Sequence, residues 1–234
     1  MNIVTRLFCS SLGKKFVMAA TGMLLFLFVV AHLVGNLQIF LGREAINRYG
    51  HFLQSNPELI WPARIGLIVL VVLHIWSAVR LTMENRAARP VAYANYNPTV
   101  ASYASRTMMW SGLIVTAFII YHLLHFTAQT PAVNFTGRDF KTLHETMPDA
   151  SMRHDVYGMM VAGFSNVGVS IWYMAAMALL CMHLSHGVGA MFQSLGWKKL
   201  PYSLFLNKFS IVAAWLIFLG YISIPLSILF GFVK

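Results

Sequence analysis

The sequence predicts an all-α integral membrane protein with five transmembrane helices. Of its 234 residues, 58% are hydrophobic and only 10% are charged, and the mean hydropathy is +0.66. This composition is typical of a polytopic membrane protein and leaves no room for a sizeable soluble domain. The apolar segments are long enough to cross a bilayer, which takes about 20 residues. We therefore expect one transmembrane domain over residues 1–234, with helices at about 16–40, 59–83, 106–128, 169–196 and 208–232.

The first two helices follow from long apolar runs with basic edges. Arg6, Lys14 and Lys15 precede an uncharged run from Phe16 to Gly42. That run exceeds the roughly 7–15 apolar residues of a signal peptide, so we expect it to remain in the membrane. A polar connection with a short interfacial helix over 45–53 leads to the second helix, which has Arg64 and Arg80 near its ends.

Prolines and polar residues mark the later connections. Residues 84–105 contain NYNP and are predicted to form a loop. The mixed-charge stretch 129–155 is the longest polar connection, and 156–168 is expected to be interfacial before the fourth helix. In the last helix, Pro225 is predicted to introduce a kink near the end.

Five spans place the termini on opposite sides of the membrane, and the basic residues set the orientation. The side of the N-terminus carries ten of the 17 Lys and Arg residues and one acid, Glu84. The positive-inside rule counts such bases and makes this side cytoplasmic. We expect a multi-pass protein of a bacterial-type cytoplasmic (inner) membrane, with its C-terminus outside. The ten bases are Arg6, Lys14, Lys15, Arg80, Arg86, Arg89, Arg106, Lys198, Lys199 and Lys208.

Charge and cysteine content exclude two functional classes. The basic residues that give the net charge of +10 lie at the edges of apolar segments, as membrane topology requires. No nucleic-acid partner is therefore expected. Cys9 and Cys181 form no ligand-spaced motif and are expected at different depths. Neither a disulfide nor a zinc site follows from them.

Four histidines pair by depth, one from each of the first four helices. At about 1.5 Å per residue, His32 and His122 lie roughly 24 Å from the cytoplasmic edge. His74 and His183 are on helices that run the other way, roughly 21–23 Å from the outer edge. This makes an outer layer of His32 with His122 and an inner layer of His74 with His183.

Paired imidazoles without carboxylates favour heme over a free metal ion. Two histidines alone leave the shell of a divalent ion incomplete, whereas a porphyrin already supplies four ligands to iron. The prediction is a four-helix bundle holding two stacked bis-histidine hemes, which would form an electron path across the membrane. Gly22 and Gly112, each ten residues before a candidate ligand, would let the flat macrocycle approach the backbone.

The roles of two further histidines are open. His125 and His186 each lie one turn from a stronger candidate on nearly the same helix face. Each is an alternative ligand, a propionate partner, a quinone contact or a packing residue.

At these residues the chain resembles the diheme cytochrome b membrane anchor of succinate:quinone oxidoreductases, the succinate dehydrogenase and fumarate reductase family with a single five-helix anchor. The resemblance covers nearly the whole chain. It rests on AHLVGN at 31–36, AINRYGHFLQS at 45–55, VLHIWSAVRL at 72–81, GLIVTAFIIYHLLHF at 112–126 and HLSHGVGAMFQSLGW at 183–197.

The resemblance implies the identity of the axial ligands of both iron atoms. His32 and His122 would hold the outer heme b, and His74 and His183 the inner heme b. The family pairs its helices in the same way as the depth argument does. The spacing from Gly112 favours His122 over His125.

The resemblance also implies partners and a substrate. A flavoprotein (FAD) subunit and an iron–sulfur subunit would dock at the cytoplasmic face and deliver electrons from succinate, so the chain alone would not oxidise succinate. A membrane quinone, menaquinone rather than ubiquinone, would accept the electrons. If the quinone site is outside, His51, Gln54 and Arg64 would line it, with Glu58 and Glu44 as the nearby acids. The physiological direction stays open.

Two other functions remain as alternatives. The first is a diheme quinone cytochrome b that serves another dehydrogenase, such as hydrogenase or formate dehydrogenase. The second is a heme-free membrane transporter that uses the histidines as a proton path. Sparse intramembrane carboxylates and the lack of an inverted repeat argue against the transporter.

Overall fold

Five long apolar helices form the body of the protein in a computed structural model, which describes residues 2–88, 91, 101–147 and 149–234. They are α2 (Ser11–Leu37), α4 (Pro57–Ala87), α6 (Met108–His122), α9 (Val167–Ser194) and α10 (Ser203–Leu229). The 3₁₀ turn η1 (Gln38–Leu41) extends α2, and the π-helical turn η2 (Leu123–Thr127) extends α6. Each of the five is long and apolar enough to cross a membrane. The predicted fold class of a multi-pass, all-α membrane protein is confirmed.

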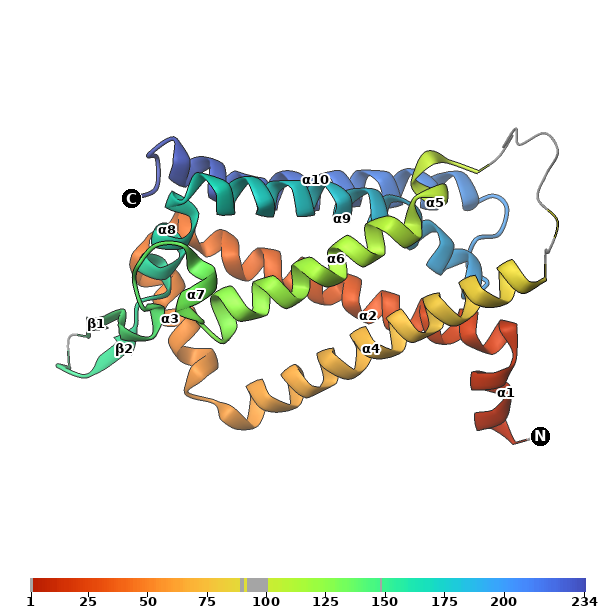
Figure 1. Cartoon of the computed structure of the whole chain (residues 1–234), viewed down its shortest axis with the longest axis horizontal. Helices are drawn as coiled ribbons and strands as arrows, with labels where there is room; N and C mark the ends of the chain where they lie inside the picture. Colours follow the sequence, from red (N-terminus) through yellow and green to blue (C-terminus); the bar gives the residue numbers. More distant parts are fainter. Residues whose placement is uncertain (1, 89–90, 92–100, 148) are drawn as a thin grey trace.

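The helices pack around α9 and α2. Helix α9 contacts α2, α6 and α10, and α2 also contacts α4. Close approach relies on small residues: Ala176 on α9 and Ala214 on α10 are fully buried. Helix α10 also fits against α2, where Gly220 meets the side chain of Leu33 and the Tyr221 hydroxyl donates to the Val29 carbonyl at 2.9 Å. The two termini lie at opposite ends of the bundle (Figure 1).

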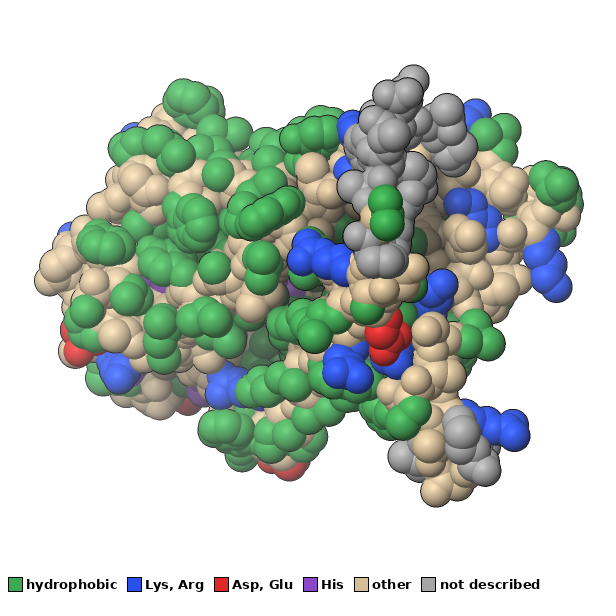
Figure 2. Space-filling model, turned by 45° about the vertical axis from the view of Figure 1, so that its right-hand side comes forward, with side chains coloured by type: hydrophobic (Ala, Val, Ile, Leu, Met, Phe, Trp, Pro, Cys, Tyr) green, Lys and Arg blue, Asp and Glu red, His purple; other side chains and the backbone are tan. Residues whose placement is uncertain are grey.

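The surface of the bundle matches this architecture. Many large apolar side chains on the long helices are exposed. On the face in Figure 2 these hydrophobic side chains cover much of the middle and left, while Lys and Arg gather towards the right-hand end. Such an apolar band with charged ends is what a lipid environment requires.

The N-terminal end corrects the predicted start of the first transmembrane helix. A short helix α1 (Ile3–Cys9) comes first, and Ser10 then caps α2 by accepting from the Gly13 amide at 3.0 Å. Helix α2 therefore begins at Ser11 rather than near Phe16, and Lys14 lies inside it. The Lys14 side chain is only 2% exposed; its ammonium lies 2.6 Å from a Glu84 carboxylate oxygen and donates to the Cys9 carbonyl. Because this ion pair neutralises the charge, the Lys14 side chain can be buried within the bundle.

Other boundaries differ from the prediction for similar local reasons. Helix α4 is longer than 59–83 at both ends, with Pro57 in its first turn, where its missing amide hydrogen costs nothing. A one-turn helix α5 (Tyr103–Arg106) precedes α6, and Thr107 separates the two. Helix α10 begins earlier and ends earlier than 208–232. The NYNP motif and Arg89 lie outside the described residues.

The C-terminal end of the bundle holds a small folded cap. The short helix expected at 45–53 is present as α3 (Arg43–Gln54), and the segment 156–168 contains α8 (Val156–Ser165). The polar connection between the third and fourth membrane helices is more ordered than predicted. It contains α7 (Pro131–Asn134), the turn η3 (Phe140–Thr142), and the antiparallel strands β1 (His144–Thr146) and β2 (Met152–His154) (Figure 1).

Charged residues connect the strands to α3 and α8. Arg153 pairs with its cross-strand neighbour Glu145 at 2.6 Å and also with Glu44 on α3. Asp155 caps α8 by accepting from the Gly158 amide at 2.9 Å, and it also accepts from Arg43 and Asn47 on α3. These contacts tie the 129–155 connection to the start of α3.

The same contacts shift the acidities of the carboxyl groups. Burial alone would raise the pKa of Asp155, but hydrogen bonds from Asn47 and the Gly158 amide, with the charge of Arg43, outweigh it and lower that pKa. The hydrogen bond from Arg153 lowers the pKa of Glu44. Both groups are therefore carboxylates at neutral pH.

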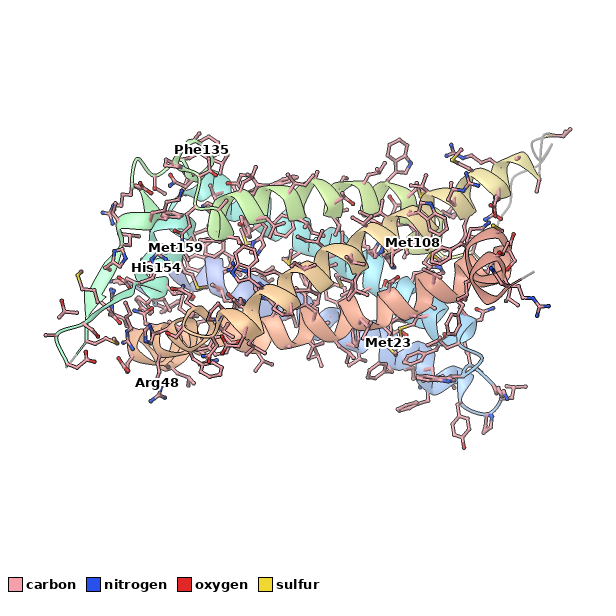
Figure 3. All side chains as sticks on the ribbon, turned by 90° about the horizontal axis from the view of Figure 1, so that it is seen from below. Met23, Arg48, Met108, Phe135, His154 and Met159 are labelled. Carbon is pink, nitrogen blue, oxygen red and sulfur yellow. The ribbon has the colours of Figure 1, made fainter. Side chains whose placement is uncertain are left out.

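Contacts at the far end of α6 complete the cap. His154 and Met159, labelled in Figure 3, lie together at this end. The side-chain amide of Gln129 is 3.0 Å from His154 Nε2 and 3.3 Å from the Met159 sulfur. The connection is thus held at its beginning by Gln129 and at its end by Asp155.

Candidate functional site: two histidine pairs in the bundle

The structure brings together the four predicted histidines as two pairs. His32 on α2 lies beside His122 on α6, with ring centres 5.8 Å apart and an interplanar angle of 81°. His74 on α4 lies beside His183 on α9, with ring centres 6.4 Å apart and an angle of 62°. All four side chains are half-buried. The pairing expected from depth along the helices is confirmed in space, and the role of the pairs as heme ligands stays a prediction.

Hydroxyl groups hold the His74 and His183 rings in place. Thr21 Oγ1 is 3.1 Å from His74 Nδ1, and Ser111 Oγ is 3.3 Å from His183 Nδ1. The Thr21 hydroxyl donates its own proton to the Val17 carbonyl at 2.8 Å, and Ser111 donates to Met108 at 3.1 Å.

These contacts favour one tautomer of both rings. A hydroxyl that gives its single proton to a backbone carbonyl accepts a proton from Nδ1 of the histidine. A neutral imidazole with its proton on Nδ1 has a free lone pair on Nε2. Such a second hydrogen bond is how proteins usually orient a metal-binding histidine.

Two glycines lie against the same pair. A Cβ atom at Gly22 on α2 would be 3.2 Å from His74 Cε1, and one at Gly112 on α6 would be 3.5 Å from His183 Cε1. Both predicted glycines therefore belong to the layer of His74 and His183, although each precedes a histidine of the other layer in sequence. The missing side chains leave the backbone of two helices close to this pair.

The other pair has a tyrosine in place of the threonine and serine. The hydroxyl of Tyr173 on α9 is 3.3 Å from His122 Nδ1 and 3.0 Å from His125 Nδ1. The structure thus separates His122 and His125 by role: His122 faces His32, while His125 contacts Tyr173 and is fully buried. His186 is half-buried on α9, and no hydrogen bond of its ring occurs within the described residues.

The residues expected near an outer quinone site differ in their contacts and exposure. Glu44 is engaged by Arg153, so its carboxylate has a structural partner. His51 lies 3.3 Å from the Ser55 hydroxyl, and the Arg64 guanidinium lies over the Trp61 ring. Gln54 and Glu58 are exposed. Of the two acids considered, Glu58 is the one that forms no ion pair among the described residues.

Sequence reasoning missed the partners of the histidines, although one signal was available. Thr21–Gly22 stands before His32 at the same spacing as Ser111–Gly112 before His122. Each hydroxyl–glycine pair lies in the layer of His74 and His183. The histidine ten residues after each glycine, His32 or His122, lies in the other layer. Tyr173 has no comparable signal.

Within the described residues, no group of three or more His, Cys, Asp or Glu side chains is placed to hold a free metal ion. Comparisons of the chain with models of protein families, with curated proteins and with solved structures find no match.

Proposed function

We propose that this protein is the membrane anchor and electron-transfer subunit of a succinate:quinone oxidoreductase. Electrons would pass from an iron–sulfur subunit through two b hemes, held by His32 with His122 and by His74 with His183, to a membrane quinone. The observation that carries the proposal is the pairing of four histidines from four membrane helices in two layers.

The donor set fits heme. An imidazole nitrogen binds a metal at about 2 Å, and the ring centres of the two pairs are 5.8 Å and 6.4 Å apart. Both imidazoles of a pair could therefore reach one heme iron. The free Nε2 of His74 and His183 and the bare backbone at Gly22 and Gly112 support the same interpretation. When bound, heme supplies a carrier of single electrons; the chain holds it, orients its ligands and excludes water.

The ends of the bundle support the choice of partners. The N-terminal end is rich in lysine and arginine, and its acid Glu84 is neutralised by Lys14. A basic face at the end of a membrane bundle suits docking of an acidic protein. In this proposal that face is cytoplasmic and receives the iron–sulfur and FAD subunits, and menaquinone is the electron acceptor.

The direct test is a reduced-minus-oxidised spectrum and a pyridine hemochrome assay on the complex purified from membranes through this chain. We expect two b hemes per chain, reduced by succinate in the presence of copurifying flavoprotein and iron–sulfur subunits. Two hemes reduced by hydrogen or formate but not by succinate would identify another dehydrogenase. Absence of heme would reject the proposal and leave the transporter as the remaining candidate.

The glycine at position 22 provides a second prediction. In Gly22→Val a side chain would press on His74, whose ring is already held by Thr21. We expect occupancy of the His74–His183 site to fall about tenfold, as for changes that disturb the shell around a metal ligand. The heme at His32 and His122 should be retained. Gly66→Val on α4 is the matched control because nothing lies within 4 Å of the added Cβ. Equal heme content in both variants would contradict the prediction.

A further inference from the structure

Tyr173 links two histidines that have different surroundings. It lies on α9 with 7% of its surface exposed, and its hydroxyl is within hydrogen-bond distance of Nδ1 of both His122 and His125. The hydroxyl has one proton to donate and can accept another. The hydroxyl can therefore accept a hydrogen bond from one imidazole and donate one to the other, so the direction of one bond fixes the direction of the other.

His125 is enclosed by aromatic rings. Its side chain is 0% exposed, and its ring centre lies 4.0–5.7 Å from those of Phe126, Tyr121, Phe140 and Tyr173. Among the described residues, its Nε2 is the one buried side-chain nitrogen or oxygen without a hydrogen-bond partner. A buried polar atom of this kind costs free energy and calls for an explanation.

The backbone is shaped to place His125 there. The π-helical turn η2 contains His125 and interrupts the α-helical geometry directly after His122. Single π turns are rare and frequently occur at functional sites. A Cβ at Gly163 of α8 would be 3.0 Å from two ring carbons of Phe126 and 3.3 Å from His125 Cε1, so a glycine makes room for both rings.

The positions of the protons follow from the role of His122. To bind iron through Nε2, neutral His122 must carry its proton on Nδ1 and donate it to the Tyr173 oxygen. Tyr173 then donates to Nδ1 of His125, whose proton is on Nε2 among the aromatic faces. The reverse direction would put a proton on Nε2 of His122 and prevent ligation.

We infer that Tyr173 and His125 are positioning residues that keep His122 in its ligating tautomer and lower the reduction potential of the iron held by His32 and His122. This rests on the proposed function. A hydrogen bond accepted from Nδ1 makes the imidazole a stronger donor and favours the ferric state. The two layers differ here, because Thr21 and Ser111 pass their protons to backbone carbonyls and Tyr173 passes its proton to a second imidazole.

The test is a redox titration of the two hemes in the complex carrying Tyr173→Phe. We expect both hemes to remain and one of them to become about tenfold easier to reduce, a rise of about 59 mV for a one-electron couple. The affected heme should be the one that His122→Ala removes. Tyr221→Phe is the control: its ring is 6.3 Å from His32, but its hydroxyl is bonded to the Val29 carbonyl.

A second pair of variants tests the direction of the bonds. In His125→Phe the Tyr173 hydroxyl loses its acceptor and turns its proton towards His122, so occupancy of this heme should fall about tenfold. His125→Gln offers a carbonyl oxygen and should restore it. Three results would overturn the inference: unchanged potentials in Tyr173→Phe, an equal shift of both hemes, or equal losses of heme in His125→Phe and His125→Gln. If the wild type still holds two hemes, the proposed function stands in each of these cases. A wild type without heme would remove both.

Discussion

Replacing either His32 or His122 with alanine is expected to remove one b heme per chain and leave the other in place. Replacing His74 or His183 should remove the second heme. The reason is that, in the proposed function, both histidines of a pair would hold one heme, so the loss of either would leave that heme with only half of its protein ligands. The measurement is a pyridine hemochrome assay per chain, which should fall from about two hemes to about one.

Double variants make this expectation sharper. His32→Ala with His122→Ala should lose no more heme than either change alone, because both act on one site, whereas His32→Ala with His74→Ala should lose both hemes. His51→Ala serves as the control, since this histidine on α3 lies 3.3 Å from the Ser55 hydroxyl and outside both pairs. Loss of both hemes from every single variant would instead indicate that the layers do not form independent sites.

Replacing Asp155 with alanine is expected to destabilise the cap at the C-terminal end by about 3 kcal/mol. The carboxylate is largely buried, pairs with Arg43, and accepts hydrogen bonds from Asn47 and from the Gly158 amide at the N-terminus of α8. Its removal therefore breaks several interactions at once. For a chain of this size, that loss lowers Tm by about 6–12 °C. Thermal unfolding of the purified protein in detergent measures it. Asp149→Ala is the matched control because Asp149 is exposed and bonds only to Ser151 among the described residues.

The same carboxylate gives the cap a defined pH dependence. The pKa of Asp155 is lower in the folded protein than in the unfolded chain, where it is about 3.9. Its contribution to stability is therefore complete above the unfolded value and is lost as the pH falls through the folded value. Glu44 acts in the same direction because Arg153 lowers its pKa. We expect the contribution of these two carboxylates to be constant from neutral pH to about pH 4 and to be lost below it.

Protease cleavage within 129–155, followed as a function of pH, measures this effect at the cap itself. The fall should be smaller in Asp155→Asn, which cannot titrate at this position. An identical pH profile in the variant and the wild type would show that other groups control the acid transition.

The helices and the histidine pairs were predictable for a simple physical reason. Hydropathy fixes which segments enter a bilayer, and a constant rise per residue fixes the depth of His32, His74, His122 and His183. Both quantities are read along the chain. No knowledge of which side each helix presents to its neighbours is required.

The remaining features depend on contacts across helices and were not accessible in this way. Lys14 was expected to precede the first helix, because its partner Glu84 is 70 residues away in sequence. The strands at 144–154 depend on Arg153 meeting Glu44, and the contact of Tyr173 with two histidines depends on the rotation of α9 and on the π turn. Hydropathy carries no information about which residues of neighbouring helices meet.

The ion pair of Lys14 with Glu84 also sets how far α2 and α4 can slide past one another. Thr21 lies seven residues above Lys14 on one helix, and His74 lies ten residues before Glu84 on the other. A slip of one helical turn would displace the helices by about 5.4 Å and carry the Thr21 hydroxyl out of reach of His74 Nδ1. The ion pair near the membrane edge thus resists sliding of α2 along α4. It thereby keeps the Thr21 hydroxyl within reach of His74, two helical turns deeper in the bilayer.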